Sequence, residues 1–360
     1  MSSIEQVNGT TPLAIMQMAT GFWVSKTLMT AVGIDIFTKI SSYQNDKNVE
    51  SVTLEEFQDI SGIRDSRPAE AFTSALVSLG LLKVDKNIKG LKTFGNTQLS
   101  SQFLDKSKST YIGDVITMFN ERLYKRWDKL SDALSTNKPV GEKQGEDIES
   151  VFDRAKSNQE TEEVQKFTRA MYGISVGPAM ALAKRVDFSY HKKMMDIGGG
   201  SGVYAIQVVA SNPGNMSAVV LDSKPVCQVA NEYIQQFNLQ DRVQTMEFDF
   251  FNDQIPKDCD VAFLSHIIHI SDREKNIELL KKIHSSLPEK GMIIISEWLL
   301  NDEKTGPVPS ALMGLNMIIE NRRGRSYSYS EVSQMLTEVG FKNIEKRPLV
   351  QPAEIIIGYK

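Results

Sequence analysis

One stretch of the chain, residues 194–222, contains residue types that suit the binding of a nucleotide-like cofactor. An apolar segment ends in Asp196, and glycines follow at positions 198, 199, 200 and 202. Glycine adopts positive φ without a Cβ penalty and lets the backbone pass close to a ligand. A second apolar segment ends in Asp222, and an acid at that point of an open α/β sheet suits a ribose diol. The stretch therefore predicts a nucleotide-type cofactor site.

The glycine spacing leaves two cofactor classes open. A dinucleotide turn follows the pattern G-x-G-x-x-G. Counted from Gly198 and Gly200, the third position is Val203, so this register fails. Counted from Gly200 and Gly202, the third position is Ala205, which the looser G/A form allows. A nicotinamide-dependent oxidoreductase is therefore a weakened alternative that the spacing does not exclude.

Two histidines follow another apolar segment, in Ser265-His-Ile-Ile-His269. Imidazole suits proton transfer because its unperturbed pKa lies near neutral pH. Histidines three residues apart can also bind a metal ion, but zinc sites need further ligands, and no Cys or further His is nearby. At a strand end we expect the two side chains to point to opposite faces. We therefore expect no metal site here.

The elements that position these residues alternate between strands and helices from residue 193 onward, which predicts a doubly wound parallel sheet. We expect helices at 226–237, 273–287, 310–319 and 330–339, and strands at 193–197, 218–221, 243–248, 261–265 and 292–297. Two last strands, 343–347 and 354–359, are connected too closely for a crossover. They should therefore be antiparallel.

The first third of the chain has a different character. Residues 53–104 predict a winged helix, with a capping box in Thr53-Leu-Glu-Glu56, a second helix at Pro68–Leu79 and two short strands. The second helix has no Lys or Arg, so we expect no nucleic-acid partner.

Residues 12–40 predict two helices broken near Gly33, rich in Met and aromatic residues. Such residues are enriched at the cores of subunit interfaces, and packing within one core is the alternative. Residues 111–188 are expected to be mostly helical, with a loop at 137–141.

Composition bounds the remaining possibilities. The 360 residues are enough for two domains. An apolar fraction of 41% and a net charge of −4 are those of an ordinary soluble protein and argue against a binder of nucleic acid or anionic membranes. The two cysteines, Cys227 and Cys259, have neither zinc nor disulfide spacing. With no signal-peptide pattern and no apolar run long enough to span a bilayer, we expect a cytoplasmic protein.

The order of these motifs resembles the class I S-adenosylmethionine-dependent O-methyltransferases of small molecules. This family is typified by plant caffeate and acetylserotonin enzymes and by bacterial polyketide-tailoring relatives, and the resemblance covers residues 12–360. It implies an α/β fold with a Rossmann-like seven-stranded methyltransferase domain in residues 111–360, of which 111–190 form a helical connector. It also implies an N-terminal helical and winged-helix dimerisation domain in residues 1–110, a homodimer, and S-adenosyl-L-methionine as the cofactor.

The resemblance also implies roles for individual residues. Asp222 matches the acid that binds the ribose hydroxyls, Asp249 the residue beside the adenine amine, and Phe250 an adjacent ring contact. A turn residue is the alternative for Asp249, because Asn252 and Asp253 follow it. The remaining expected cofactor contacts are Phe167, Met171, Ser175, Asp196, Gly198, Gly200 and Ser265.

His269 matches the family's catalytic base, which removes the proton of the acceptor hydroxyl, and Glu297 matches an acid that orients it. The alternative is that His269 makes its hydrogen bonds within the protein and has no catalytic role. The chain departs from the family at two places. His269-Ile-Ser-Asp272 replaces the usual His-Asp-Trp, and Ser326 stands where a second orienting glutamate is expected. These departures leave methylation at carbon or nitrogen open.

The helix at 311–319 resembles the segment that lines the acceptor pocket. Helical spacing places Met313, Asn316 and Met317 on one face, which suits a small, largely apolar acceptor of aromatic or polyketide type. Core packing is the alternative for the two Met residues. Arginines at 322, 323 and 325 fit either an anionic group of the acceptor or a solvated loop. A non-catalytic, cofactor-sensing winged-helix protein is the remaining alternative function, and the presence of both His269 and Glu297 argues against it.

Overall fold

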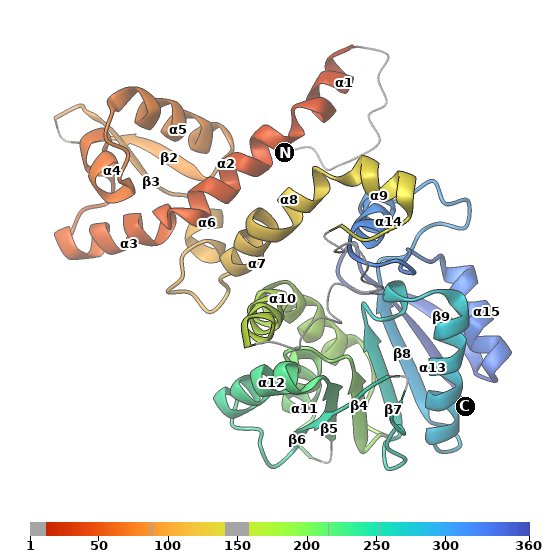
Figure 1. The fold of residues 1–360 in the computed structure, drawn as a ribbon. Helices are drawn as coiled ribbons and strands as arrows, with labels where there is room; N and C mark the ends of the chain where they lie inside the picture. Colours follow the sequence, from red (N-terminus) through yellow and green to blue (C-terminus); the bar gives the residue numbers. More distant parts are fainter. Residues whose placement is uncertain (1–11, 88, 141–157, 215, 251) are drawn as a thin grey trace. The chain divides into compact units, whose positions relative to one another are not determined.

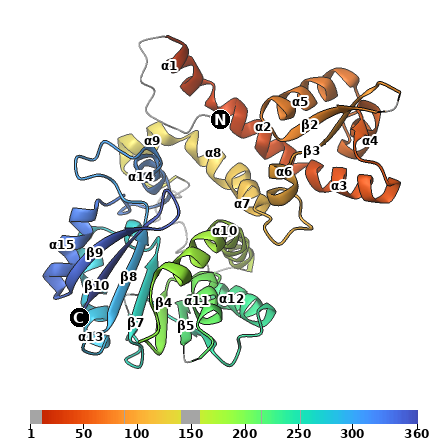
Figure 2. The same cartoon turned by 180° about the vertical axis from the view of Figure 1, so that it is seen from behind.

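The computed structural model describes residues 12–87, 89–140, 158–214, 216–250 and 252–360. The chain forms two compact units, Met1–Lys125 and Arg126–Lys360 (Figures 1 and 2). The domain boundary that the sequence predicted, at residue 110, lies before this division, which follows Lys125. Among the described helices, none combines the length and the hydropathy that crossing a bilayer requires.

The first unit begins with three helices where the sequence predicted two. The chain breaks at Thr20 as well as near Gly33, because residue 20 ends the first helix in a turn. The third helix begins after Asp35, which has a left-handed backbone with φ of 58°. These helices are α1 (Pro12–Ala19), α2 (Gly21–Gly33) and α3 (Ile36–Lys47).

The winged-helix elements follow. The predicted capping box is present: the Thr53 hydroxyl accepts from the Glu56 N–H, and the Glu56 carboxylate accepts from the Thr53 N–H. The second helix begins at Ser66, two residues earlier than predicted, so Arg67 lies in its first turn. A short strand before the first helix completes a sheet of order β1-β3-β2. The elements are β1 (Val52–Thr53), α4 (Leu54–Ser61), α5 (Ser66–Ser78), β2 (Leu82–Lys86) and β3 (Lys92–Asn96).

Short helices connect this region to the large sheet of the second unit. They are α6 (Gln98–Phe103), α7 (Gly113–Met118), the π-helix η1 (Phe119–Leu123), α8 (Tyr124–Trp127) and α9 (Leu130–Thr136). The long helix α10 (Asn158–Arg185) then leads to the first strand of the sheet. The sequence predicted this helix from residue 152, and residues 152–157 lie outside the described residues.

The second unit contains a seven-stranded sheet of order β6-β5-β4-β7-β8-β10-β9. The first five strands in this order are parallel, and β10 is antiparallel to both β8 and β9, as predicted for the last two strands. The strands are β4 (Lys193–Ile197), β5 (Ser217–Asp222), β6 (Val243–Glu247), β7 (Val261–Ser265), β8 (Met292–Glu297), β9 (Lys342–Pro348) and β10 (Glu354–Tyr359).

Helices cover both faces of this sheet (Figures 1 and 2). On one face α10, α11 (Val203–Ser211) and α12 (Lys224–Gln236) pack against Met194 and Val220. On the other face α13 (Arg273–Ser286) and α15 (Tyr329–Val339) pack against Met195 and Leu221. Successive strand residues alternate between the two cores because side chains alternate across a strand. The remaining elements are the 3-10 turn η2 (Ile268–Ile270) and the helix α14 (Val308–Glu320).

Candidate functional site

The glycine turn joins the end of β4 to the start of α11. The Gly198 N–H donates to the Leu221 carbonyl over 2.8 Å, and the Gly200 N–H donates to the Asp222 carboxylate over 3.0 Å. Gly198, Gly200 and Gly202 all have positive φ, which only glycine adopts without strain. A Cβ on Gly200 would meet nothing within 4 Å. The turn therefore leaves open space beside Gly200, next to the acid at the end of β5.

Gly199 is glycine for a different reason. A Cβ there would lie 2.6 Å from the Asp196 carboxyl carbon and 2.8 Å from a methyl group of Val220. Asp196 is buried, and one of its oxygens accepts from the Ala205 N–H over 3.3 Å. The other oxygen finds no partner among the described residues. The sequence did not single out Gly199, although its place between two other glycines was the available signal.

Both acids at this edge of the sheet have raised pKa values. Burial raises the pKa of Asp196 to about 7, against the N–H donated by Ala205, and the nearby Asp222 charge adds to the increase. Burial also raises the pKa of Asp222 to about 6, although its carboxylate accepts from the N–H groups of Ser223 and Gly200. A cation or a hydroxyl donor bound beside either carboxyl would therefore lower its pKa.

Phe250 lies over the glycine turn. A Cβ on Gly198 would lie 3.2 Å from its ring and 2.2 Å from the Ile267 side chain. The ring also packs edge-on against Phe248, with centroids 5.8 Å apart. Asp249 is exposed, and its carboxylate accepts from both the backbone and the side chain of Asn252. These are the contacts of a turn residue, so the adenine contact of Asp249 stays a prediction.

Three other expected cofactor residues lie on α10. Phe167, Met171 and Ser175 are half-buried, on a helix that packs against α11 and α12. Ser265 ends β7, where the pairing of Ile197 with Leu264 sets it level with Gly198. A role for these four residues in cofactor binding stays a prediction.

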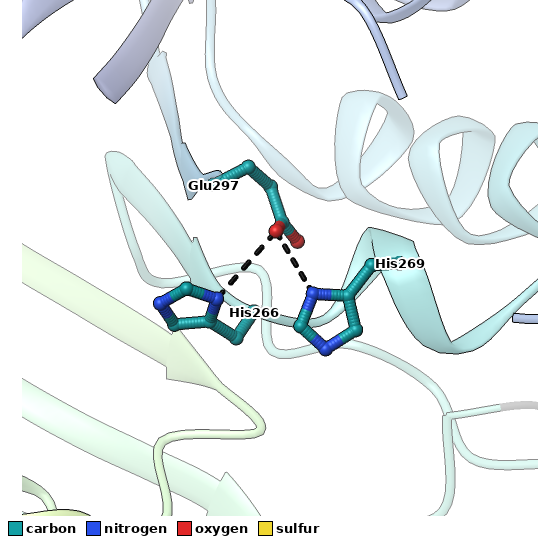
Figure 3. Close-up of side chains that lie close together, drawn as sticks. All are labelled: His266, His269 and Glu297. Carbon is teal, nitrogen blue, oxygen red and sulfur yellow. Dashed lines mark hydrogen bonds and ion pairs between the residues drawn. The ribbon is translucent and has the colours of Figure 1, made fainter. Parts of the chain in front are cut away.

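The expected base and its acid are in contact (Figure 3). His269 Nδ1 lies 2.9 Å from Glu297 Oε2, and both residues are buried. Burial alone would raise the pKa of the Glu297 carboxyl, but the imidazoles of His269 and His266 hold it well below its ordinary value. Glu297 is therefore ionised and can only accept hydrogen bonds. His269 must then bear its proton on Nδ1, which leaves the lone pair of Nε2 available for a proton.

The expectation that the two histidines point to opposite faces is wrong. His266 Nδ1 lies 3.6 Å from the same Glu297 oxygen, and the two rings are 5.4 Å apart. His266 has a left-handed backbone, with φ of 56°, so the alternation of an extended strand does not apply to it. Its N–H donates to the Ser296 carbonyl of β8 over 3.0 Å, and its ring packs edge-on against Trp298.

Buried polar residues hold the turn that bears His269. Asn276 of α13 donates to the Ile268 carbonyl over 2.8 Å and to the Tyr327 hydroxyl over 3.2 Å. The Tyr327 hydroxyl donates in turn to the Ser271 carbonyl over 2.7 Å. The Arg325 N–H donates to the His269 carbonyl over 2.8 Å. Asn276 and Tyr327 were not predicted from the sequence. An Asn on the apolar side of an amphipathic helix was the signal for the first.

At the two places where the chain departs from the family pattern, Ser326 and Asp272 make contacts within the protein. The Ser326 hydroxyl donates to the Ser310 carbonyl over 2.8 Å, so it serves the packing of α14. Asp272 caps α13 by accepting from the Lys275 N–H, and it also pairs with Arg323 over 2.8 Å. Arg323 therefore has an acidic partner within the protein.

Helix α14 bears the expected acceptor residues. Met313 and Asn316 are half-buried, whereas Met317 is buried and lies 3.2 Å from a Cβ built on Gly324. The indole N–H of Trp127 donates to Asn316 Oδ1 over 3.1 Å. Because indole nitrogen is only a donor, this bond places the amide oxygen of Asn316 toward Trp127. The contact of these residues with an acceptor stays a prediction.

Family models and known proteins match this chain over most of its length. The family model for an O-methyltransferase domain matches residues 127–342, and the model for an O-methyltransferase dimerisation domain matches residues 16–106. A 3-hydroxy-5-methyl-1-naphthoate 3-O-methyltransferase from Streptomyces sahachiroi is 29% identical over 351 residues, which cover 97% of this chain and 95% of that protein. The tetracenomycin polyketide synthesis 8-O-methyl transferase TcmO from Streptomyces glaucescens is 27% identical over 349 residues, 97% of each chain.

Solved structures show the same fold. The crystal structure of human N-acetylserotonin methyltransferase in complex with SAM superposes with a TM-score of 0.85, at 23% identity, over 99% of both chains. The family models thus match both parts of the chain, and the solved structure has the same fold. The chain belongs to the S-adenosylmethionine-dependent O-methyltransferases of small molecules.

Proposed function

We propose that this protein transfers a methyl group to the hydroxyl of a small, largely apolar acceptor of aromatic or polyketide type, with His269 as the general base. The observation that supports the proposal best is the buried contact of 2.9 Å between His269 Nδ1 and Glu297 Oε2. It supports the tautomer with the proton on Nδ1, which leaves Nε2 free to accept a proton. The similarity to O-methyltransferases of naphthoate and polyketide substrates supports the acceptor class.

The cofactor fits the residues at the glycine turn. Open space lies beside Gly200, Asp222 lies at the end of the neighbouring strand, and one buried oxygen of Asp196 is without a partner among the described residues. The first two suit the backbone and the ribose of S-adenosylmethionine, and the third suits a donor such as its ammonium group. When bound, the cofactor supplies a methyl group made electrophilic by its sulfonium.

The residues of the chain then have separate tasks. Asp222, Gly200 and Phe250 hold the cofactor, and α14 positions the acceptor. His269 Nε2 takes the hydroxyl proton as the oxygen becomes methylated, and the Glu297 carboxylate stabilises the imidazolium that forms. Alignment and proton removal are the main contributions that a protein can make to such a transfer.

The test combines calorimetric titration with an activity assay. We expect micromolar binding of S-adenosylhomocysteine, and none of NADH measured in parallel. Asp222→Ala should abolish that binding, whereas His269→Ala should keep it and lower kcat by about a hundredfold or more on a phenolic acceptor. Binding of NADH in preference would contradict the cofactor, and a fully active His269→Ala would contradict the base.

A further inference from the structure

Three side chains, one of which is the proposed base His269, have the composition of a metal site. Among the described residues, His266, His269 and Glu297 each offer one ligand atom, and these atoms lie within 4.8 Å of one another. Figure 3 shows both Nδ1 atoms turned toward the Glu297 carboxylate from different sides. We expected no metal here for two reasons: the imidazoles should point to opposite faces, and no Cys or further His is nearby in the sequence. The structure removes the first reason, and Glu297 of β8 supplies a third possible ligand.

The separations between the Glu297 oxygen and the two imidazole nitrogens are close to those of a zinc site, and all three ligand atoms lie within 4.8 Å of one another. Ligand atoms about 2.0–2.2 Å from a tetrahedral zinc ion lie roughly 3.3–3.6 Å apart. The two Nδ1–Oε2 separations are 3.6 Å for His266 and 2.9 Å for His269. The first already fits, and the second needs a shift of about 0.4 Å. Such a shift is within the reach of a side-chain rotation.

Charge and donor type also favour a divalent ion. Two imidazole nitrogens and a carboxylate oxygen suit Zn²⁺ and its neighbours in the transition series. Glu297 is a buried carboxyl group at the centre of this cluster. Its Oε1 atom is buried and has no partner among the described residues. A bound dication would compensate the charge of this buried carboxylate.

The ligands are held in place, and one side of the site is open. Glu297 ends a central strand, the N–H of His266 is bonded to Ser296, and the Asn276 and Arg325 bonds hold the turn of His269. The side chain of His266 is 32% exposed, against 11% for His269 and 5% for Glu297. An ion would enter from the His266 side and keep an open position for water, as in zinc sites with three protein ligands.

We propose that His266, His269 and Glu297 bind a divalent transition-metal ion, with Zn²⁺ as the best match, and that the ion inhibits methyl transfer. The second half of this proposal rests on the proposed function. An imidazole that binds a metal through Nδ1 bears its proton on Nε2, so His269 could no longer accept the proton of the acceptor hydroxyl. The ion would also take the Glu297 oxygen that stabilises the imidazolium.

Calorimetric titration of the full chain with zinc chloride, after treatment with EDTA and removal of any affinity tag, tests the site. His266→Gly is the informative variant, because glycine accepts the φ of 56° without strain. His191→Asn is the matched control, since His191 Nδ1 also lies near a carboxylate, 3.8 Å from Asp260, but without a second histidine. We expect one ion per chain in the wild type and in His191→Asn, and at least about tenfold weaker binding in His266→Gly.

Visible absorption of the cobalt-loaded protein tests the coordination geometry. We expect Co²⁺ bound by two nitrogens and one oxygen to absorb in the visible range in the wild type, and we expect His266→Gly to lack this absorption. Circular dichroism of each variant verifies its fold. Equal zinc affinity in the wild type and in folded His266→Gly would overturn the site.

Activity then tests the inhibition. Added Zn²⁺ should lower the initial rate of methyl transfer, EDTA should restore it, and His266→Gly should need at least about tenfold more Zn²⁺ for the same fractional inhibition. If zinc binds as described and the wild type methylates no hydroxyl acceptor, the metal site stands and the proposed function fails. If methyl transfer occurs and zinc neither binds nor inhibits, the metal site fails alone.

Discussion

Glu297 is one carboxylate between two imidazoles, and no second carboxylate is available to His269 from the position of Ser326. The Ser326 hydroxyl is used by the Ser310 carbonyl, so it contributes packing where a glutamate would contribute charge. If His269 takes a proton as proposed, the imidazolium would be stabilised by one buried anion at 2.9 Å. An acceptor hydroxyl that already releases its proton readily would need less from this arrangement.

The glycine turn offers a pair of substitutions that separate cofactor binding from packing. Gly200→Ala introduces a Cβ into open space, at the cost of a left-handed φ of 57°. We expect it to fold, with a loss of about 1–2 kcal/mol of stability, and to bind S-adenosylhomocysteine at least about tenfold more weakly. Calorimetry and thermal unfolding measure the two effects.

Gly199→Ala is the counterpart, because its Cβ would lie 2.6 Å from the Asp196 carboxyl carbon. It should destabilise the fold itself by more than Gly200→Ala does. Unimpaired cofactor binding in Gly200→Ala would show that the open space beside Gly200 is not the cofactor site.

The raised pKa of Asp196 predicts a pH-dependent stability. Burial raises this pKa to about 7, so the contribution of the protonated carboxyl to folding is full below its unfolded pKa of about 4 and is lost as pH rises through about 7. Asp196→Asn stays neutral. Its free energy of unfolding relative to the wild type should therefore rise by on the order of 2–3 kcal/mol between pH 5 and pH 8.

Urea unfolding of both proteins at four pH values measures that difference. A difference that stays constant with pH would mean that Asp196 ionises in the folded protein as easily as in the unfolded chain.

The turn η2 contains His269, and it is therefore the element that sets the position of this side chain most directly. Tyr327→Phe removes the hydroxyl that donates to the Ser271 carbonyl and accepts from Asn276. We expect a loss of about 0.5–1.5 kcal/mol of stability and a several-fold lower kcat, with unchanged affinity for S-adenosylhomocysteine. Tyr329→Phe is the control, since its hydroxyl bonds the Ile344 carbonyl over 3.3 Å, away from the turn. An equal kcat in the two variants would contradict a positioning role for Tyr327.

The sequence predicted the central parallel strands β4, β5, β7 and β8 well, because they are largely buried on both faces and form largely apolar runs, whereas β6 is mostly exposed. The strands at 193–197, 261–265 and 292–297 have the predicted bounds. The first helices were predicted less well, because the break at Thr20 has no Gly or Pro at the turn residue itself. The start of α5 at Ser66 was missed because Pro68 is tolerated in the first turn of a helix.

Side-chain directions at strand ends could not be predicted in the same way. The direction of His266 depends on a left-handed backbone, and its N–H bonds to Ser296, a residue of another strand. The pairing of both histidines with one oxygen is therefore a property of the assembled sheet. Alternation along a single strand cannot reveal it.

At the scale of the whole molecule, the first two helices present a surface that suits a second copy of the chain. The match to a dimerisation domain at residues 16–106 supports a homodimer. Large apolar side chains on α1 and α2 are exposed, and exposed patches of this kind mark interfaces. They belong to Leu13, Ile15, Met16, Met18, Phe22 and Trp23.

Charge at that surface should disrupt the dimer. We expect the double variant Ile15→Glu, Met18→Glu to elute as a monomer in size-exclusion chromatography with light scattering, whereas the wild type elutes as a dimer. Leu134→Glu is the control, because Leu134 is equally apolar and exposed but lies on α9. Removal of residues 1–45 would be a poorer test, since it deletes Ile36, Phe37 and Ile40 from the core. A double variant that remains dimeric would exclude this surface as the interface.

The order of the last strands also determines when the catalytic sheet can be completed during synthesis. β9 is made before β10, but β10 lies between it and β8. Until the ribosome has released residues 354–359, β8 keeps an open edge and β9 has no strand to pair with. Glu297 at the end of β8 pairs with Glu354 of that later strand, so the strand that bears Glu297 gains its second neighbour only after residues 354–359 have emerged.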